Sequence, residues 1–328
     1  MVYIEKKKIG GREYLYLSKN VRVSKGKWRK IRKYVGTDLS NLEQAEKELE
    51  LIQPVKRLLT LRQMKIIELL KTNYLKKHKI GKSLWKTEKD QIISFIYNTN
   101  AIEGVPVSFE DTKNIVEGEK TAERYGKRDI LEVKNMKECI DFLFDYKGGF
   151  NLGLLLKLHK IEMDGVRADA GRIRTGQNIV GNYLPPRPKQ VPVELESFFS
   201  WFKEAEKILH PFELAGLVHL KIARIHPFMD GNGRVSRLLM NHILFQNNYP
   251  LLNIYNSEKM LYYLVLREVD AKKKEKPFIK YLYQVYITQY KNYLLQNNDA
   301  SMYAKLSKGK TRPVEEMMND LRDKSDRF

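Results

Sequence analysis

The chain has 328 residues, with 60 Lys and Arg against 40 Asp and Glu, a formal net charge of +20, and 42% hydrophobic residues. This composition argues against a wholly disordered chain, and no apolar run approaches the ~20 residues of a membrane span. The single cysteine, Cys139, excludes an internal disulfide, and no Cys/His cluster has the spacing of a zinc site. We therefore expect a cytoplasmic protein with no membrane partner.

Residues 1–36 form a strongly basic segment with twelve Lys and Arg and only two acids, which is half of the chain's net charge. The β-favouring runs 14–17 and 28–35 lie on either side of a Ser24-Lys25-Gly26 turn. They predict a small basic β-hairpin or three-strand ribbon. Its charge is either simply solvated or contacts the phosphates of a nucleic acid. The lack of a recognisable nucleic-acid module favours the first reading.

The rest of the chain has the apolar spacing of helices. Residues 37–84 predict a helical linker, with a run over 42–77 that Pro54 should break. Next come a helix over 87–103 ended by Gly104, a short helix capped by Ser108, and helices over 128–146 and 152–163. A Gly181-Asn182 pair predicts a tight hairpin. Helices return over 193–208, 211–225, 233–247, 257–269 and 277–295, before a polar tail over 296–328.

One segment stands apart from this helical pattern: His226-Pro-Phe-Met-Asp-Gly-Asn-Gly-Arg-Val-Ser-Arg237. Pro227 disfavours helix in the residue before it, and the Gly231-Asn-Gly233 stretch allows φ > 0 and close approach of a ligand. The next helix points its first N–H groups into this loop, beside two arginines. The segment therefore predicts a phosphate site.

Two further side chains suggest what such a site could do. His226 is a candidate general base, because the ordinary pKa of histidine lies near physiological pH. Asp230 is suited to Mg²⁺, which prefers oxygen ligands and phosphate oxygens. The combination predicts phosphoryl or nucleotidyl transfer.

The segment from His226 to Arg237 matches the Fic motif, His-Pro-Phe-x-Asp-Gly-Asn-Gly-Arg-x-x-Arg, at every specified position. Over roughly residues 85–290 the chain resembles the Fic/Doc superfamily. The resemblance implies a mainly α fold: a Fic-type helical bundle over residues 85–295 with a small β-hairpin flap between Gly171 and Pro186. It also implies a protein adenylyltransferase that uses ATP and Mg²⁺ to modify a Ser, Thr or Tyr hydroxyl of a target protein.

The resemblance also implies a role for each matching residue. His226 would deprotonate the target hydroxyl, and Asp230 would hold Mg²⁺. The phosphates would be bound by Gly231, Asn232, Gly233, Arg234 and Arg237, with Tyr263 near the adenine. The flap would dock the target by adding a strand through Ile179, Val180, Gly181, Asn182 and Tyr183. Both motif glycines are kept, which favours AMP transfer over the phosphorylation performed by the related Doc-type kinases.

A second segment, Thr99-Asn-Ala-Ile-Glu103-Gly104, resembles the family's inhibitory motif. It ends the predicted helix over 87–103, N-terminal to the catalytic segment. A Glu103–Arg237 ion pair would occupy the arginine meant for the γ-phosphate, so we expect auto-inhibition. Thr99 is the first residue of this motif.

Alternatives to AMP addition remain open at this point. The same site could remove AMP or transfer another phosphate-containing group. An alternative of another class is a nucleic-acid-associated regulator that uses the basic ribbon. A homodimer is a further expectation from the family. We expect His159 and His219 to pack in the core rather than catalyse.

Overall fold

The computed structural model describes residues 2–24, 27–42, 45, 57–78, 88–119, 124–181 and 183–294. The chain divides into one compact unit of residues 1–57 and 192–210, and a second of residues 58–191 and 211–328. The mainly α fold is confirmed. None of the described helices is both long and apolar enough to cross a bilayer. The predicted tail over 296–328 lies outside the described residues.

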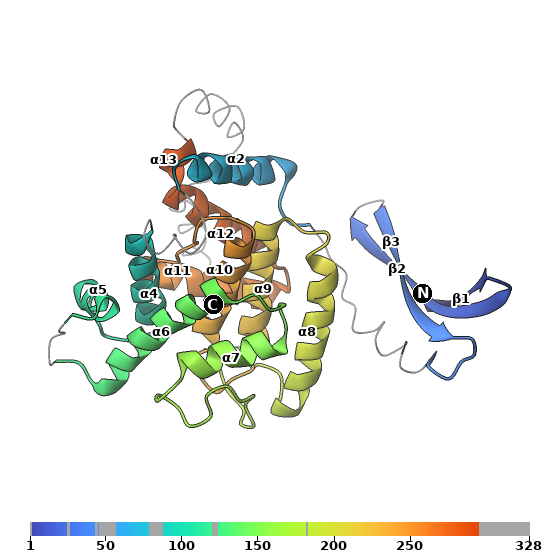
Figure 1. Cartoon of the computed structure of the whole chain (residues 1–328), viewed down its shortest axis with the longest axis horizontal. Coiled ribbons are helices and arrows are strands. Elements are labelled where there is room, and N and C mark those ends of the chain that lie inside the picture. The colour runs from blue at the N-terminus through green and yellow to red at the C-terminus, as the bar shows by residue number, and fades with distance from the viewer. Residues whose placement is uncertain are drawn as a thin grey trace. The chain divides into compact units, whose positions relative to one another are not determined.

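The first unit contains the basic ribbon, shown in blue in Figure 1. Strands β1 (Val2–Ile9), β2 (Arg12–Ser24) and β3 (Lys27–Gly36) pair antiparallel in the order β1-β2-β3, which confirms a three-strand ribbon. Two glycines with φ of 58° and 81° turn β1 into β2. Leu15, Leu17 and Val35 are buried in a cluster with Ala45. This unit also holds most of α8 (Val191–Ala205).

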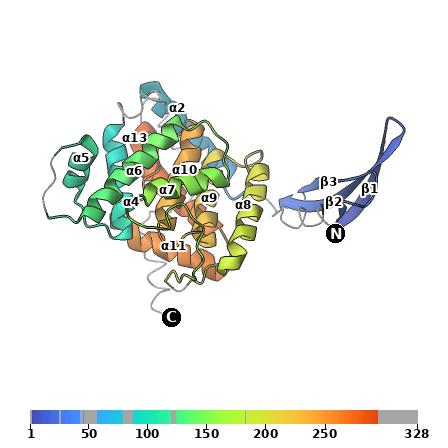
Figure 2. The same ribbon diagram turned by 60° about the horizontal axis from the view of Figure 1, so that its bottom comes forward.

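The second unit is helical. Helices α9 and α10, joined by the motif loop, lie side by side, and α4, α6 and α7 also contact α10 (Figures 1 and 2). The helices of this unit are α2 (Leu61–Lys77), α4 (Lys89–Glu103), α5 (Phe109–Glu117), α6 (Lys127–Asp145), α7 (Leu152–Glu162), α9 (Pro211–Ile225), α10 (Asn232–Gln246), α11 (Lys259–Lys272), α12 (Lys276–Gln289) and α13 (Lys291–Leu294).

Local capping explains where several helices begin and end. The Ser108 Oγ accepts from the Asp111 N–H at 3.1 Å and starts α5, while Gly104, at φ 95°, ends α4. The predicted helix over 42–77 is wrong in one respect. Residues 57–60 are not helical and Thr60 caps a new helix, α2, in a capping box with Gln63. The expected break at Pro54 lies outside the described residues.

The single helix predicted over 277–295 is also wrong, because α12 ends at Gln289 and a short α13 follows. Tyr290 leaves helical geometry at φ −114° and ψ 19°. Its buried hydroxyl donates to the Leu251 carbonyl oxygen at 2.6 Å and lies 2.7 Å from the Gln91 Oε1. These contacts with distant residues interrupt a pattern that is helical in sequence alone.

The predicted hairpin at Gly181-Asn182 is reduced to one bridge, between Val180 and Tyr183. Gly181 has a φ of 56°, as the turn requires, and Asn182 lies outside the described residues. Prolines follow at 185, 186 and 188, and proline cannot donate to a strand ladder. A two-stranded hairpin is marginal alone, so the flap stays irregular beyond the bridge.

Candidate active site

The loop over residues 226–231 joins α9 to α10. Pro227 follows His226 directly, at the point where α9 has ended. The Asn232 side chain closes the loop: its Oδ1 accepts from the Phe228 N–H and its Nδ2 donates to the Phe228 carbonyl oxygen, both at 2.9 Å. Gly231, at φ 75°, turns the chain into the helix. The Asn232 side chain therefore braces the loop.

His226 is half-buried at the start of this loop. Its Nδ1 lies 3.2 Å from the Ala223 carbonyl oxygen, which can only accept, so Nδ1 carries the proton and Nε2 the lone pair. Burial lowers the pKa of His226 below its ordinary value of 6.5, which keeps the ring neutral at pH 7. Its backbone φ of 52° is uncommon for a residue other than glycine. These features suit a general base.

Arg174 holds this strained residue from the flap side. Its buried guanidinium donates from Nε to the His226 carbonyl oxygen at 2.7 Å, from Nη1 to that of Gly176 at 2.9 Å, and from Nη2 to that of Pro186. Its own N–H donates to the Pro227 carbonyl oxygen at 2.9 Å. Arg174 thus ties both ends of the flap to the candidate base. In the sequence it stood out only as part of the flap.

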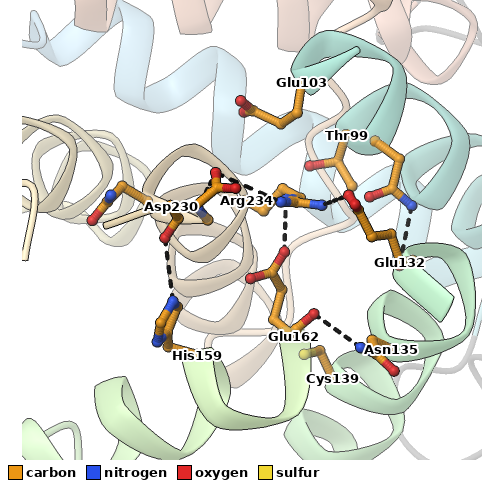
Figure 3. Close-up of polar contacts among 12 residues, drawn as sticks. Thr99, Glu103, Glu132, Asn135, Cys139, His159, Glu162, Asp230 and Arg234 are labelled. Carbon is orange, nitrogen blue, oxygen red and sulfur yellow. Dashed lines mark hydrogen bonds and ion pairs between the residues drawn. The ribbon is translucent and has the colours of Figure 1, made fainter. Parts of the chain in front are cut away.

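Arg234, at the start of α10, lies between carboxylates of two other helices (Figure 3). Its Nη1 pairs with Glu132 of α6, and its Nε lies 2.6 Å from the Glu162 Oε1 of α7. Asp230 Oδ1 is 4.0 Å from its Nη2. Burial raises the pKa of Glu162 to about 8, although Arg234 opposes the shift. The guanidinium therefore fixes the start of α10 to α6 and α7, and no sequence signal pointed to these two carboxylates.

Arg237, one turn further along α10, is buried against the end of α4. Its Nε donates to the Thr99 Oγ1 at 2.7 Å, and its Nη2 donates to the Thr99 carbonyl oxygen at 3.0 Å and to the Glu103 Oε1 at 2.6 Å. Burial is the largest single influence and would lower the pKa of Arg237, but Glu103 and Tyr262 together outweigh it and the pKa is raised. The expected Glu103–Arg237 ion pair is present.

The Glu103 carboxylate also lies against the first turn of α10. A Cβ built on Gly233 would be 2.3 Å from the Glu103 Oε1 and 3.2 Å from the Arg237 Nη1. A larger side chain at Gly233 would therefore collide with the carboxylate. Within the Gly231-Asn-Gly233 stretch, Gly231 takes the positive φ, whereas Gly233 lies within the helix and permits close approach.

His159 supports the loop from α7, as Figure 3 shows. Its Nδ1 accepts from the Gly171 N–H at 2.9 Å, so the proton lies on Nε2, which donates to the Asp230 carbonyl oxygen at 3.2 Å. Its ring stacks on Phe228 with centroids 3.7 Å apart. Burial lowers the pKa of His159 to about 4. The prediction that His159 and His219 are buried packing residues is confirmed.

The flap residues lie beside this loop. The Tyr183 hydroxyl donates to the Arg224 carbonyl oxygen at 3.0 Å, and the Asn178 Nδ2 donates to two loop carbonyl oxygens at 3.0 Å. Ile179 is 76% exposed and Val180 is 40% exposed. The flap is therefore anchored by Asn178 and Tyr183, and it exposes the apolar side chains of Ile179 and Val180 to solvent.

Tyr263, on α11, lies beside the end of α4. Its hydroxyl is 3.4 Å from the Ile102 carbonyl oxygen, and burial raises the pKa of this phenol. The structure thus brings Tyr263 to the same helix end that carries Glu103. It lies close to the groups that surround Arg237.

Comparison with known proteins agrees with this geometry. Residues 149–244 match the model of the Fic/DOC family. A protein adenylyltransferase Fic from Culex quinquefasciatus is 32% identical over 213 residues, which is 62% of this chain and 42% of that protein. One from Nematostella vectensis is 30% identical over 200 residues, 59% of this chain and 47% of that protein. The chain thus spans less than half the length of these curated relatives.

Solved structures show the same fold. A Fic domain containing signaling protein from Bacteroides thetaiotaomicron aligns with a TM-score of 0.63 at 25% identity, covering 70% of this chain and 97% of that one. Fic-1 from C. elegans aligns with a TM-score of 0.60 at 26% identity, covering 71% of this chain and 70% of that one. The complete motif in the loop over 226–231 and the start of α10, the family match over residues 149–244 and this common fold show that the chain contains a Fic/DOC domain.

Proposed function

We propose that this chain is a protein adenylyltransferase that transfers AMP from ATP to a Ser, Thr or Tyr hydroxyl of a target protein. The single observation that supports this most directly is the 3.2 Å contact between the His226 Nδ1 and the Ala223 carbonyl oxygen. The Nδ1 of His226 is turned to this oxygen, so its basic Nε2 is available beside the start of α10. Relatives at about 30% identity carry this activity in their names.

The proposed reaction is a single displacement at phosphorus. His226 Nε2 takes the proton of the target hydroxyl as that oxygen attacks the α-phosphorus of ATP. The new oxygen–phosphorus bond forms while the bond to the β-phosphate's bridging oxygen breaks. AMP remains on the target and pyrophosphate leaves.

The start of α10 would hold the polyphosphate. Its first backbone N–H groups lack acceptors within the helix and carry partial positive charge. Gly231, Asn232 and Gly233 would contribute these N–H groups, since the Asn232 side chain is bound to Phe228. The Gly231 N–H, which donates to the Asp230 Oδ1 at 2.7 Å, would exchange that acceptor for a phosphate oxygen. Arg234 would add charge from its place between Glu132 and Glu162. Tyr263 would lie near the adenine.

Asp230 fits the Mg²⁺ that ATP would bring. Its side chain is 42% exposed at the loop, and Mg²⁺ is commonly held by one or two carboxylates together with phosphate oxygens. When bound, the ion would neutralise charge on the phosphates. The described residues contain no cluster of three or more metal-binding side chains.

Glu103 would act as a brake on this reaction. Its carboxylate holds Arg237, the arginine proposed for the γ-phosphate, and lies where Gly233 leaves room. A bound triphosphate would place negative charge against this carboxylate. The flap would dock the target through residues 179–183.

Labelled ATP tests the proposal. We expect the Glu103→Gly variant to transfer label from the α-phosphate to protein about 10- to 100-fold faster than wild type, because a charged hydrogen bond to Arg237 is removed. Label at the γ-phosphate should not transfer. Peptide mapping should find AMP on a hydroxyl side chain.

Two controls make the test decisive. Glu103→Gln keeps the size of the side chain and removes its charge, so it should also be activated. Adding His226→Ala to Glu103→Gly should abolish transfer. Transfer of γ-label would identify a kinase, and equal labelling without His226 would exclude it as the base. Release of AMP from modified protein by wild type would favour the removal reaction instead.

Two further expectations remain part of the proposal. A homodimer follows from the family resemblance. A reducing compartment such as the cytoplasm is consistent with Cys139, which is a buried free thiol.

A further inference from the structure

The basic ribbon has two different faces, and among its described residues the apolar core cluster lies on one of them. Side chains alternate between the faces of a strand, so Leu15 and Leu17 share the face that is buried with Val35 and Ala45. Tyr14 and Tyr16 point to the opposite face, where the register places Tyr34 of β3 beside Tyr16. The tyrosines of this second face are not part of the apolar cluster.

The second face combines aromatic rings with cations. The rings of Tyr16 and Tyr34 have centroids 5.5 Å apart, and those of Tyr14 and Tyr34 are 6.3 Å apart. Lys7 Nζ lies 5.7 Å from the centroid of Tyr16. At the other end of the face, Lys30 Nζ lies 5.3 Å from the centroid of the Tyr3 ring. Tyrosine rings and cations thus lie next to one another on this face.

The Glu5 carboxylate holds two cations of this face, Arg32 and Lys30, in place. It accepts from the Arg32 Nε at 2.9 Å and lies 2.8 Å from the Lys30 Nζ. Arg32 and then Lys30 lower the pKa of Glu5 to about 2. Three cations (Lys7, Lys30 and Arg32) stand against this one carboxylate, so the face keeps a positive charge.

The rings are also accessible. Tyr34 is 55% exposed and Tyr3 is 36% exposed, whereas Leu17 on the other face is 2% exposed. The cross-strand Tyr16–Tyr34 pair supports the sheet itself, and the exposed part of the Tyr34 ring remains open to a ligand. Aromatic rings between cations are the arrangement that stacks nucleobases and holds the phosphates between them.

We propose that this face of the ribbon binds single-stranded nucleic acid. Unpaired bases stack on Tyr34 and Tyr3, and the backbone phosphates contact Lys7, Lys30 and Arg32. A duplex hides the flat surfaces of its bases, so stacking selects the single strand. An anionic membrane or an acidic protein would use the charge but would not require the exposed rings.

Fluorescence anisotropy of the full-length chain with a labelled 12-nucleotide oligo(dT) or oligo(U) tests this. We expect binding, with Tyr34→Ala about tenfold weaker and Tyr34→Phe within about twofold of wild type, because the ring and not the hydroxyl stacks. Lys7→Glu should weaken binding and reduce the slope of log affinity against log salt by about 0.7. Lys65→Glu, on the exposed side of α2, makes the same change in net charge and should have little effect.

The contrary outcomes are equally specific. Equal affinity for a duplex of the same length, or no loss in Tyr34→Ala, would overturn a stacking surface. Binding to phosphatidylserine vesicles in place of oligonucleotide would also overturn it. AMP transfer in the Glu103→Gly background should be unchanged by Tyr34→Ala, which separates this proposal from the enzymatic one.

Discussion

The three hydrogen bonds that the Arg174 side chain makes among the described residues go to carbonyl oxygens and not to a carboxylate. A buried charge needs such partners, and burial lowers the pKa of this guanidinium. Because one acceptor is the carbonyl of His226, the side chain couples the flap to the proposed base. It acts through His226 and is therefore a positioning residue.

We predict that Arg174→Lys lowers kcat for AMP transfer by about tenfold or more in the Glu103→Gly background. The lysine ammonium is a point charge that cannot reproduce the planar fork of three donors. The KM for ATP should stay within about twofold, because Arg174 does not line the start of α10. Steady-state kinetics measure both values.

Arg172→Lys is the matched control, since Arg172 is exposed two residues away. A change confined to the KM for ATP, or an equal loss of kcat in Arg172→Lys, would show that Arg174 does not position the base.

At the scale of elements, α4 delivers two groups to one arginine. Thr99 and Glu103 are four residues apart and therefore share a face of the helix. Both contact Arg237 of α10, and Gly104 ends α4 directly after Glu103. In the proposed reaction, the position of α4 on α10 would decide whether Arg237 is available to a phosphate.

We predict that Thr99→Val raises AMP transfer about five- to tenfold, less than Glu103→Gly does. The substitution removes the hydroxyl that accepts from the Arg237 Nε but keeps the Thr99 carbonyl oxygen and the Glu103 pair. Initial rates with α-labelled ATP measure the effect. Thr112→Val, a buried threonine on α5, serves as the control, and equal activation there would contradict a specific role for Thr99.

At the scale of the whole molecule, buried histidines set the response to acid. Burial lowers the pKa of His159 to about 4, of His219 to about 3 and of His242 to about 4. The ordinary pKa of a histidine is 6.5. Below that pH, these histidines therefore bind protons in the unfolded chain that they do not bind in the folded chain. Their contribution to stability is complete above pH 6.5 and is lost as pH falls toward 4.

Glu162 acts in the opposite sense, because its raised pKa of about 8 makes the folded chain bind a proton that the unfolded chain lacks above pH 4.5. These three histidines and Glu162 leave a difference of about two protons near pH 5.5, while the lowered pKa of His226 and the raised pKa values of Glu258 and Asp270 act in opposite directions. We therefore predict that the free energy of unfolding decreases by about 2–3 kcal/mol for each unit by which the pH is lowered in this range. The free energy of unfolding should be highest near pH 6–7.

Urea unfolding of the helical far-ultraviolet signal at several pH values checks this. The His242→Leu variant should reduce the slope by about half, because it leaves a difference of about one proton. A stability that is constant between pH 5 and 7 would contradict the prediction.

Features that depend on neighbouring residues could be predicted from the chain alone. Gly104 predicted the end of α4, Ser108 predicted the start of α5, and the sequence also predicted the loop at Pro227 and a basic hairpin or three-strand ribbon, since capping and turn conformations are local. The motif resemblance added the Glu103–Arg237 pair.

Tertiary structure decided the contacts between distant segments. Arg234 lies between Glu132 and Glu162, Arg174 holds His226, and the hairpin shrinks to a single bridge. No spacing or period in the sequence marks such partners, because they depend on how the helices pack. The residues of the loop could be read from the chain, but the groups that hold and restrain them are set by packing.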